Sequence, residues 1–397
     1  MTAGAARVAL QARPVRFADI PRSCWERLLS VTAAATPFAR WTFHRAWWDA
    51  YGDAAHEQYM VVVPSDGATD RIDWELVRAI VPLMHRHEIE PDDIINRSIL
   101  RPADGRSSVS RTVPGDAKAI FFGASYHADY ATILASPADV AAVTAAIADS
   151  FTHATDPAHG STPWDVVDLR RLRSDDPLLP ALQAALSAAD PAWDVIRERE
   201  DVCPVITAPS ADWDEYLATL DKKDRHEIRR KLRRAAVVGD LSIEILTPSG
   251  EALEQFIELH TLRFGEHGLF PEGAGGERSR RFIQRLGELE SASADGGQLH
   301  VALVRCGYHG LIWSALAFDD GDTCFLYNAG MDPSASEVSP GITGTAMYLM
   351  DRLKAGRRRF DFLRGDEPYK YEWGAKDETI ERLLVLRDEA LPEEAAA

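Results

Sequence analysis

The chain has 397 residues, 46% hydrophobic and 27% charged, so it can bury substantial cores and is neither a disordered nor a fibrous sequence. Its 62 Asp and Glu residues against 44 Lys and Arg give a net charge of −18, which disfavours a dedicated duplex-DNA binder. Four widely spaced cysteines and the lack of a bilayer-length apolar run lead us to expect a soluble cytoplasmic protein without disulfides, zinc or a membrane span.

The first half is predicted to alternate helices and strands. Helices are expected over 25–31, 38–51, 136–151 and 177–189 from apolar spacing and from cap residues such as Thr36 and Ser136. Alternating apolar residues predict strands over 58–63, 76–87, 120–123, 164–169 and 193–199. The long polar loop 96–118 is expected to be either a binding lid or a solvated insertion.

Proline punctuation over 203–209 predicts a boundary between a domain at 1–202 and a domain at 203–397. In the second domain, helices are expected over 213–220, 222–237, 251–266, 278–289 and 341–354. Strands are expected over 241–246, 299–306, 311–318, 323–329, 360–363 and 379–387, with residues 319–322 as a hairpin turn. The tail from Glu393 is expected to fray.

Both halves share the succession of meander strands, helix and strand, which indicates an α/β fold and a divergent tandem duplication. Each half is expected to form a mixed sheet flanked by helices. In the second half, a mixed sheet requires the helix over 341–354 as a crossover that joins a meander strand to a parallel neighbour.

A candidate anion site lies where the helix over 341–354 begins. Small and hydroxyl residues gather there, and unpaired N–H groups at the positive end of a helix dipole bind phosphate. The alternative is that Ser339 only caps the helix and Pro340 only starts it. The candidate binding residues are Ser339, Gly341, Ile342, Thr343, Gly344 and Thr345.

A second candidate site covers residues 360–374. Asp361 stands between two phenylalanines on a strand, and charged and aromatic residues follow in a turn, a pattern that is costly for folding alone. The alternative is a solvated turn in which Tyr371 and Trp373 anchor the end of the sheet.

These segments resemble the CelD-like acetyltransferases of the GNAT superfamily, which are relatives of the Fem peptidyltransferases. The resemblance covers most of the second half, through residues 213–217, 224–231, 338–341 and 369–374, and continues more weakly in Thr36-Pro37-Phe38 and Trp47-Trp48. It implies two tandem GNAT-like lobes, with the transferase in the second.

The resemblance also implies a donor and a site. In GNAT enzymes the acyl-CoA pyrophosphate lies on the loop and helix after the fourth strand, which here corresponds to residues 339–345. The usual Arg/Gln-x-x-Gly-x-Gly/Ala pattern is incomplete, since neither Val338 nor Gly341 supplies its first residue. Fem-type relatives share Phe-Lys-x-x-Phe-Gly, with the Lys in the transfer centre, and this chain reads Tyr-Lys-Tyr-Glu-Trp-Gly over 369–374, so that Lys370 takes that place.

Acyl transfer needs a base for the amine and a donor for the oxyanion. The predicted catalytic residues are Lys370, as an ammonium that stabilises the oxyanion, and Asp361 or Glu372, as the proton acceptor. A bulge near residues 328–330 is expected to add a backbone N–H donor.

Two further patterns carry weaker predictions. Residues 222–234 hold eight Lys and Arg against two acids, which indicates either a face for phosphates, tRNA or a polyanionic glycan, or a solvated helix face. His85 and His87, with Glu88, lack a third ligand at suitable spacing, so no metal site is expected.

The sequence therefore predicts an N-acyltransferase that uses an acyl-CoA, with acetyl-CoA as the expected donor, and a small-molecule, sugar or peptide amine as the acceptor. One alternative is a Fem-type transferase that uses aminoacyl-tRNA, with the basic helix as the tRNA contact. The other is a catalytically silent binding or scaffold protein in a polysaccharide or secondary-metabolite pathway. The fold alone does not identify the acceptor.

Overall fold

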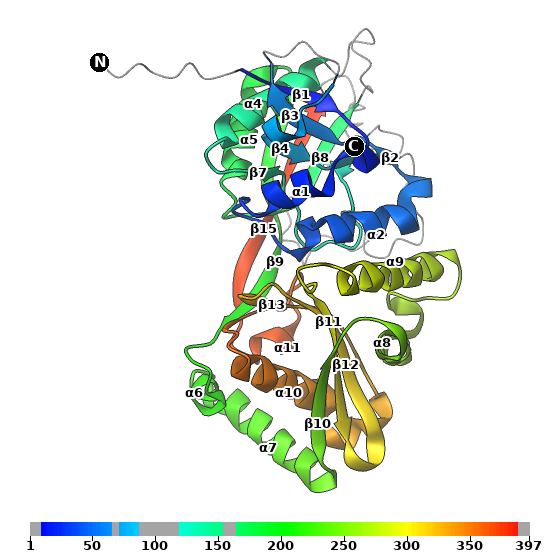
Figure 1. Cartoon of the computed structure of the whole chain (residues 1–397). Coiled ribbons are helices and arrows are strands. Elements are labelled where there is room, and N and C mark those ends of the chain that lie inside the picture. The colour runs from blue at the N-terminus through cyan, green and yellow to red at the C-terminus, as the bar shows by residue number, and fades with distance from the viewer. Residues whose placement is uncertain (1–8, 66–70, 87–118, 154–163, 388–397) are drawn as a thin grey trace, which may run out of the picture. The chain divides into compact units, whose positions relative to one another are not determined.

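The computed structural model describes residues 9–65, 71–86, 119–153 and 164–387 (Figure 1). The chain divides into two units. Unit 1 comprises Met1–His44, Tyr51–Asp201 and Thr379–Ala397, and unit 2 comprises Arg45–Ala50 and Val202–Glu378. In the described part of the chain, no helix has the length and apolarity needed to cross a bilayer. The predicted loop 96–118, His87, Glu88 and the tail from Glu393 lie outside the described residues.

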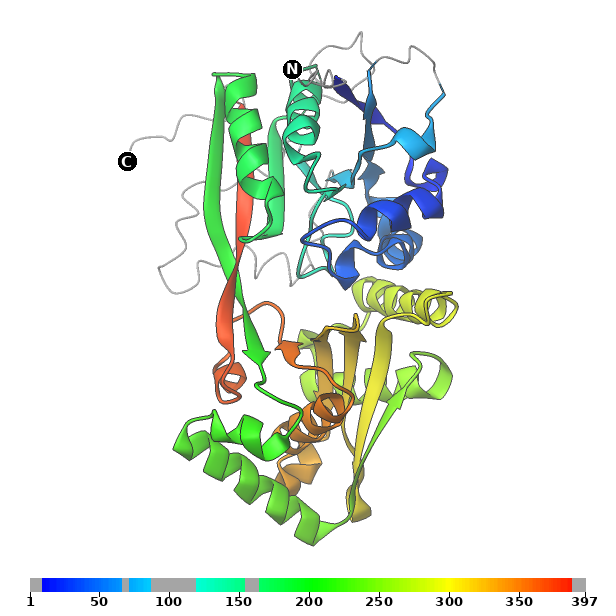
Figure 2. The same ribbon diagram turned by 60° about the vertical axis from the view of Figure 1, so that its left-hand side comes forward.

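Unit 1 has mixed β-structure flanked by helices, with the strand orders β1-β3-β4-β7 and β9-β15-β8-β6-β5-β2. Figure 2 shows β9 and β15 side by side, with α5 next to them. Its elements are β1 (Leu10–Pro14), α1 (Arg22–Leu29), α2 (Trp41–Tyr51), β2 (His56–Glu57), β3 (Met60–Pro64), β4 (Ala79–Val81), β5 (Leu83–Arg86), β6 (Ala119–Phe122), β7 (Leu134–Ala135), α4 (Val140–His153), β8 (Val166–Arg173), α5 (Leu178–Ala189), β9 (Trp193–Thr207) and β15 (Lys376–Arg387), with 3-10 turns η1 (Phe17–Asp19), η2 (Pro37–Ala39), η3 (Gly52–Ala54) and η4 (Trp74–Leu76).

Two predictions for unit 1 are wrong in detail, each because of a proline. The strand expected over 76–87 is two strands, β4 and β5, in different sheets, because Pro82 between them has no N–H for a ladder. The carbonyl of Pro82 instead accepts from the N–H of Gly123 at 2.8 Å. Pro37 begins the 3-10 turn η2, and the helix expected from residue 38 starts only at Trp41.

Unit 2 is also a mixed sheet flanked by helices, with the strand order β10-β11-β12-β13-β14-β9. Its elements are α6 (Trp213–Ala218), α7 (Lys222–Val238), β10 (Leu241–Leu246), α8 (Gly250–Phe264), α9 (Ala274–Ser291), β11 (Leu299–Cys306), β12 (Gly310–Asp319), β13 (Thr323–Met331), α10 (Pro340–Lys354), β14 (Arg359–Asp361) and α11 (Pro368–Tyr371), with 3-10 turns η6 (Gly265–His267), η7 (Gly307–His309) and η8 (Pro333–Val338). The short helix α11 was not predicted.

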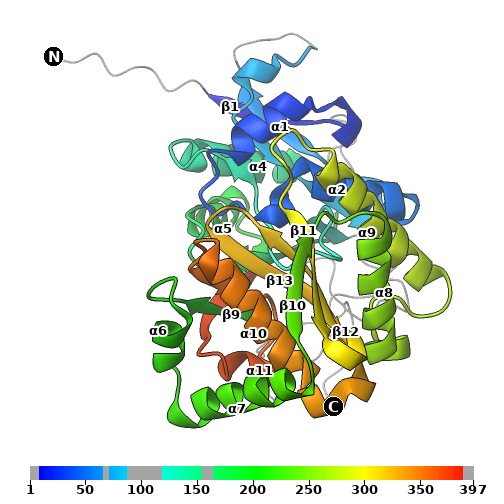
Figure 3. The same ribbon diagram turned by 60° about the horizontal axis from the view of Figure 1, so that its bottom comes forward.

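The predicted crossover is confirmed. β13 and β14 pair in parallel, and α10 connects them, whereas the other pairings of β10 to β14 are antiparallel. Figure 3 shows α7 and α10 on one side of these strands and α8 on the other. The core of unit 2 lies between the sheet and these helices and includes Trp313, Tyr348 and Leu349.

The predicted boundary over 203–209 stays a prediction, and its first residues belong to β9, which continues to Thr207. Pro204 is tolerated within this strand because it contributes only its carbonyl, which accepts from the N–H of Phe362 at 3.0 Å. The next residues pair with β14, with Val205 opposite Asp361 and Thr207 opposite Arg359.

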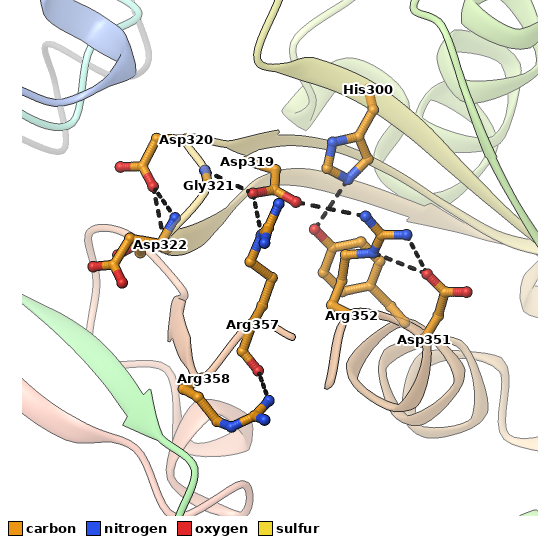
Figure 4. A network of polar contacts seen from close by, with 11 residues as sticks. His300, Asp319, Asp320, Gly321, Asp322, Asp351, Arg352, Arg357 and Arg358 are labelled. Carbon is orange, nitrogen blue, oxygen red and sulfur yellow. Dashed lines mark hydrogen bonds and ion pairs between the residues drawn. The ribbon is translucent and has the colours of Figure 1, made fainter. Parts of the chain in front are cut away.

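The predicted hairpin turn between β12 and β13 is confirmed and belongs to a polar network (Figure 4). Asp320 accepts from the N–H groups of Asp322 and Thr323 at 2.9 and 2.7 Å. Asp319 accepts from Arg357 at 2.6 Å and pairs with Arg352, on α10, at 3.5 Å. These ion pairs fix the last turns of α10 to the hairpin.

Candidate active site

The strand β13 carries a bulge at its middle. In its pairing with β12, Leu316 faces Asn328 and Ala317 faces Leu326, so Tyr327 is an extra residue. The pairing of β13 with β14 ends at Phe325 and Asp361. Residues 326–331 of β13 therefore extend beyond its pairing with β14. The bulge confirms the expectation drawn from the Asn and Gly residues near position 328.

The N-terminus of α10, where an anion site is predicted, has no side-chain cap. Ser339 precedes the helix in a left-handed conformation, with φ 49° and ψ 63°, and its side chain makes no capping hydrogen bond. The N–H of Thr343 bonds to the carbonyl of Ser339 at 3.0 Å, whereas first-turn N–H groups such as those of Gly341 and Ile342 have no acceptor within a helix. Ser339, Gly341 and Ile342 are all partly exposed.

The other three predicted binding residues face the interior. The Thr343 hydroxyl is buried and donates to the carbonyl of Val338 at 2.7 Å. A Cβ built at Gly344 would overlap the ring of Trp313, so this glycine allows α10 to pack on β12. Thr345 is 6% exposed. The structure thus divides the predicted binding residues into the partly exposed Ser339, Gly341 and Ile342 and a packed group at 343–345.

The basic helix α7 packs against α10 and against η8, the turn before Ser339. Three of its cations are paired: Arg229 with Asp214 at 2.7 Å, and Arg230 and Lys231 with Glu227. Four exposed cations of α7 have no ion pair among the described residues, and these are Lys222, Lys223, Arg233 and Arg234. The structure therefore brings the two predicted anion-binding features together.

Asp361 lies at the end of β14 and is 1% exposed. Its Oδ1 accepts from the N–H of Leu363 at 2.7 Å, and Leu363 has a positive φ of 58°, which is unusual for a residue with a branched side chain. The carboxylate thus holds the chain in a tight turn after the strand. A role as the catalytic base stays a prediction.

Lys370, on α11, is 3% exposed and closes the same turn. Its Nζ donates to the carbonyls of Leu363, Arg364 and Gly365 at 3.0, 2.8 and 3.0 Å. It also lies 2.8 Å from Glu367. All three ammonium hydrogens thus have acceptors within the chain. An oxyanion role for Lys370 stays a prediction and requires one of these bonds to break.

The remaining predicted residue, Glu372, is exposed directly after α11. Its neighbour Trp373 is buried, and the carbonyl of Trp373 accepts from the hydroxyl of Tyr216 at 2.7 Å. Trp373 therefore anchors the segment to α6, as the purely structural interpretation expected. Of the two predicted bases, Asp361 and Glu372, it is Glu372 that is exposed to solvent.

His260, on α8, was missed by the sequence reasoning. It is 2% exposed, and burial lowers the pKa of its imidazole to about 4. A Cβ built at Gly330 would overlap the backbone of His260, so this glycine allows α8 to lie directly on β13. The sequence feature that could have indicated this close packing is a glycine, Gly330, two residues after Asn328 on a strand.

Two other expectations concern metals and cysteines. His85 is buried, and its Nδ1 lies 3.0 Å from the carbonyl of Ala119. Among the described residues, no group of three His, Cys, Asp or Glu side chains is arranged to hold a metal ion. All four cysteines lie in the described part of the chain, where they are buried and form no disulfide.

Residues 222–371 match the family described as the acetyltransferase (GNAT) domain. This part of the chain is therefore similar to GNAT acetyltransferase domains. The match begins at α7 and ends with α11, so it contains the bulge, the open start of α10 and the turn held by Lys370. The enzyme class is therefore acyltransferase. The narrower resemblance to CelD-like acetyltransferases stays a prediction, and no curated protein sequence matches the chain significantly.

Solved structures share the fold at low sequence identity. FemX matches with a TM-score of 0.54 and 10% identity, over 94% of this chain and 96% of its own. A conserved protein of unknown function from Bacteroides thetaiotaomicron matches with a TM-score of 0.51 and 13% identity, over 93% and 98%. The C-terminal domain of a putative lysylphosphatidylglycerol synthetase from Agrobacterium fabrum matches at 0.49 and 12%, over 94% and 93%. FemX and the Bacteroides protein thus support the α/β fold over nearly the whole chain.

Proposed function

We propose that the chain is an acyl-CoA-dependent N-acyltransferase whose donor site is the N-terminus of α10. The observation that carries the proposal is the uncapped helix start at Ser339, Gly341 and Ile342, inside the GNAT domain and beside the basic helix α7. Unpaired N–H groups and the helix dipole suit a pyrophosphate, and the exposed cations of α7 favour the charge of coenzyme A.

In the proposed reaction, the amine of the acceptor attacks the thioester carbonyl carbon and forms a C–N bond. The C–S bond then breaks, coenzyme A leaves as a thiol or thiolate, and the amine proton goes to a base. Glu372 is the exposed candidate for that base, whereas Asp361 already accepts from the N–H of Leu363. Lys370 holds the turn between Asp361 and Glu372. It can act on the oxyanion only if one of its hydrogen bonds to a backbone carbonyl breaks.

The alternative function is aminoacyl transfer from charged tRNA, and one observation favours it. The exposed cations of α7 form an unpaired positive surface on a chain of net charge −18. Such a surface suits the phosphates of an RNA as well as those of coenzyme A. The FemX fold match is compatible with this alternative.

Calorimetric titration of the purified protein with acetyl-CoA and with longer acyl-CoAs tests the proposal. We expect binding at sub-millimolar concentration. Binding of charged tRNA without binding of any acyl-CoA would contradict the proposal in favour of the aminoacyl alternative. Binding of neither would favour the silent binding or scaffold protein.

A further inference from the structure

The helix α7 of unit 2 has two different faces. Its inner face packs on the core through Ile228, Leu232 and Ala235, which follow one another at spacings of four and three residues. Ile228 and Ala235 are buried, and Leu232 is partly buried. This contact leaves the opposite face of α7 on the outside of unit 2, and Figure 2 shows the helix in green at the bottom edge of that unit.

The outer face is basic over most of the length of the helix. Its exposed positions from Lys222 to Arg234 carry only Lys, Arg or His. The first and last of these cations lie about 18 Å apart along the helix axis. The exposed lysines and arginines, which we call the basic face, are Lys222, Lys223, Arg230, Arg233 and Arg234. In the described part of the chain, only Arg230 of this group is in an ion pair, with Glu227.

The basic face ends beside an apolar tip, which consists of Val237 on α7 and Tyr308 in η7. Their exposed fractions are 86% and 96%. The end of α7 and η7 lie together, because a Cβ built at Gly239 would be 2.7 Å from the Cα of Gly307, whose N–H donates to the carbonyl of Asp240 at 3.0 Å. Neither side chain of the tip contributes to the core, so both are available to a partner.

The partner that fits this surface is anionic and also accepts apolar side chains next to its charges. A bilayer with anionic lipids has both properties: its surface attracts clusters of four to eight Lys and Arg residues, and Tyr is favoured at its interface. An RNA would pair with the cations but has no apolar interior for Val237. We propose that the basic face of α7 and the apolar tip bind the surface of an anionic lipid bilayer.

The net charge of −18 is compatible with this docking and selects its orientation. The Debye length is about 10 Å at 0.1 M salt, so a bilayer in contact with α7 interacts mainly with the cations of the basic face. The acidic remainder of the chain disfavours other orientations. The inference goes beyond the proposed function and does not depend on it, because binding to vesicles requires no acyl-CoA.

Flotation of the full chain with lipid vesicles tests the proposal. The vesicles contain either phosphatidylcholine alone or a two-to-one mixture of phosphatidylcholine and phosphatidylglycerol. We expect binding to the mixed vesicles only, and weaker binding when salt is raised to 1 M, where the Debye length falls to about 3 Å. Equal binding to both kinds of vesicle, or binding to neither, would overturn the proposal.

Single charge variants test the basic face. Lys222→Gln and Lys223→Gln should each lower the partition coefficient for the mixed vesicles by about 5-fold, because each removes one cation at the lipid surface. The matched control is Arg281→Gln, at an exposed arginine of α9, which should leave the partition coefficient unchanged. Equal losses in the lysine variants and in the control would show a general effect of charge and contradict the role of α7.

A double variant tests the apolar tip and separates a bilayer from an RNA. Val237→Ser combined with Tyr308→Ser should lower the vesicle partition coefficient by about 10-fold without loss of stability, since both side chains are exposed. Leu262→Ser, at a 57% exposed position of α8, is the control and should change neither. Binding of tRNA that depends on Lys222 and Lys223 but not on the tip, together with no vesicle binding, would show an RNA surface and overturn the proposal.

Insertion of the tip is measured directly with an environment-sensitive fluorophore. The four native cysteines are buried, so the fluorophore is attached at Val237→Cys or, as the control, at Leu262→Cys. Mixed vesicles should shift the emission to shorter wavelength at position 237 and not at position 262. Bound protein with no shift at position 237, or with the same shift at both positions, would contradict docking through the tip.

Discussion

Each unit has a parallel strand pair whose connection contains a helix, and the two helices begin differently. In unit 1 the pair is β6 and β8, and the helix is α4. The Oγ of Ser136 accepts from the N–H of Ala138 in the turn before the helix, and Asp139, directly before α4, lies 3.9 Å from Arg78. In unit 2 the start of α10 has no side-chain cap and no acidic residue in its first turn.

The difference shows how one topology serves two purposes. A capped helix start with a carboxylate satisfies its own N–H groups and repels an anion. An uncapped start leaves N–H groups for a ligand. The connection itself is a folding element in both units, and the proposed donor site in unit 2 depends on the residues at the start of its helix.

The largest expected effect is a loss of stability at low pH, and it tests whether the cores of both units are destabilised equally when their buried histidines are protonated. Burial lowers the pKa of His44 and His127 in unit 1 to about 3, and that of His260 and His300 in unit 2 to about 4. Unfolded histidine titrates near 6.5, so between pH 6.5 and the folded pKa the unfolded chain binds more protons. The free energy of unfolding should therefore fall by about 2 kcal/mol for each histidine from pH 6.5 to pH 5.

Urea unfolding across this pH range measures the effect. His44→Gln and His300→Gln should each remove about one proton from the pH dependence of the unfolding free energy. A flat dependence in the wild-type protein would show that these imidazoles are not buried in neutral form.

The next comparison concerns two buried cations. Arg171, on β8 in unit 1, and Lys370 in unit 2 are 1% and 3% exposed, and both donate to backbone carbonyls. Arg171→Met and Lys370→Met should each lower the unfolding free energy by about 3 kcal/mol, since buried carbonyls lose their donors. Only Lys370→Met should also lower kcat. A 100-fold loss of kcat with unchanged stability would instead support Lys370 as the oxyanion donor.

The packing of the unit 2 helix on its sheet gives a smaller effect. Gly344→Ala should lower the unfolding free energy by about 2 kcal/mol, because the new methyl group would overlap Trp313. Gly275→Ala, on α9, is the matched control: its Cβ would meet no atom within 4 Å, and alanine favours a helix by about 0.5–1 kcal/mol. Thermal unfolding of the two variants should therefore shift in opposite directions.

The smallest effect tests the comparison of helix starts directly. Gly341→Asp places a carboxylate where the donor phosphate is expected, and acetyl-CoA affinity should fall by about 10-fold, measured by calorimetry. Asp139→Ala removes the carboxylate at the start of α4 in unit 1 and should leave that affinity unchanged. Unchanged affinity in a folded Gly341→Asp protein would exclude α10 from the donor site.

Apolar periodicity was sufficient to predict the architecture of unit 2. The strand over 241–246 and the helix α7 were placed within one residue, and the crossover helix followed from the need to join parallel strands. Periodicity failed where single residues interrupt or extend it. Pro82 splits one expected strand into two sheets, and β9 passes through Pro204 because only its carbonyl is needed there.

The candidate site was less predictable because it depends on contacts distant in sequence. Thr343 and Gly344 are residue types typical of a phosphate-binding loop. In the structure, however, the Thr343 hydroxyl bonds to the carbonyl of Val338, and Gly344 packs against Trp313. Lys370 was identified from a motif that resembles one in Fem-type proteins. The three carbonyls that it binds lie five to seven residues earlier, in a turn that no sequence pattern predicts. His260 is 70 residues from Gly330, against which its backbone packs, and no local spacing links them.

The place of β15 has a consequence for synthesis of the chain. Its residues from Thr379 belong to unit 1, where β15 lies between β9 and β8, and Arg382 pairs with the buried Asp168 at 2.7 Å. A ribosome makes these residues after all residues of unit 2. Until they emerge, the nascent N-terminal unit keeps an open edge on β8 and a buried carboxylate without this partner. The unit that is made first is therefore completed last, after every residue of unit 2 has been synthesised.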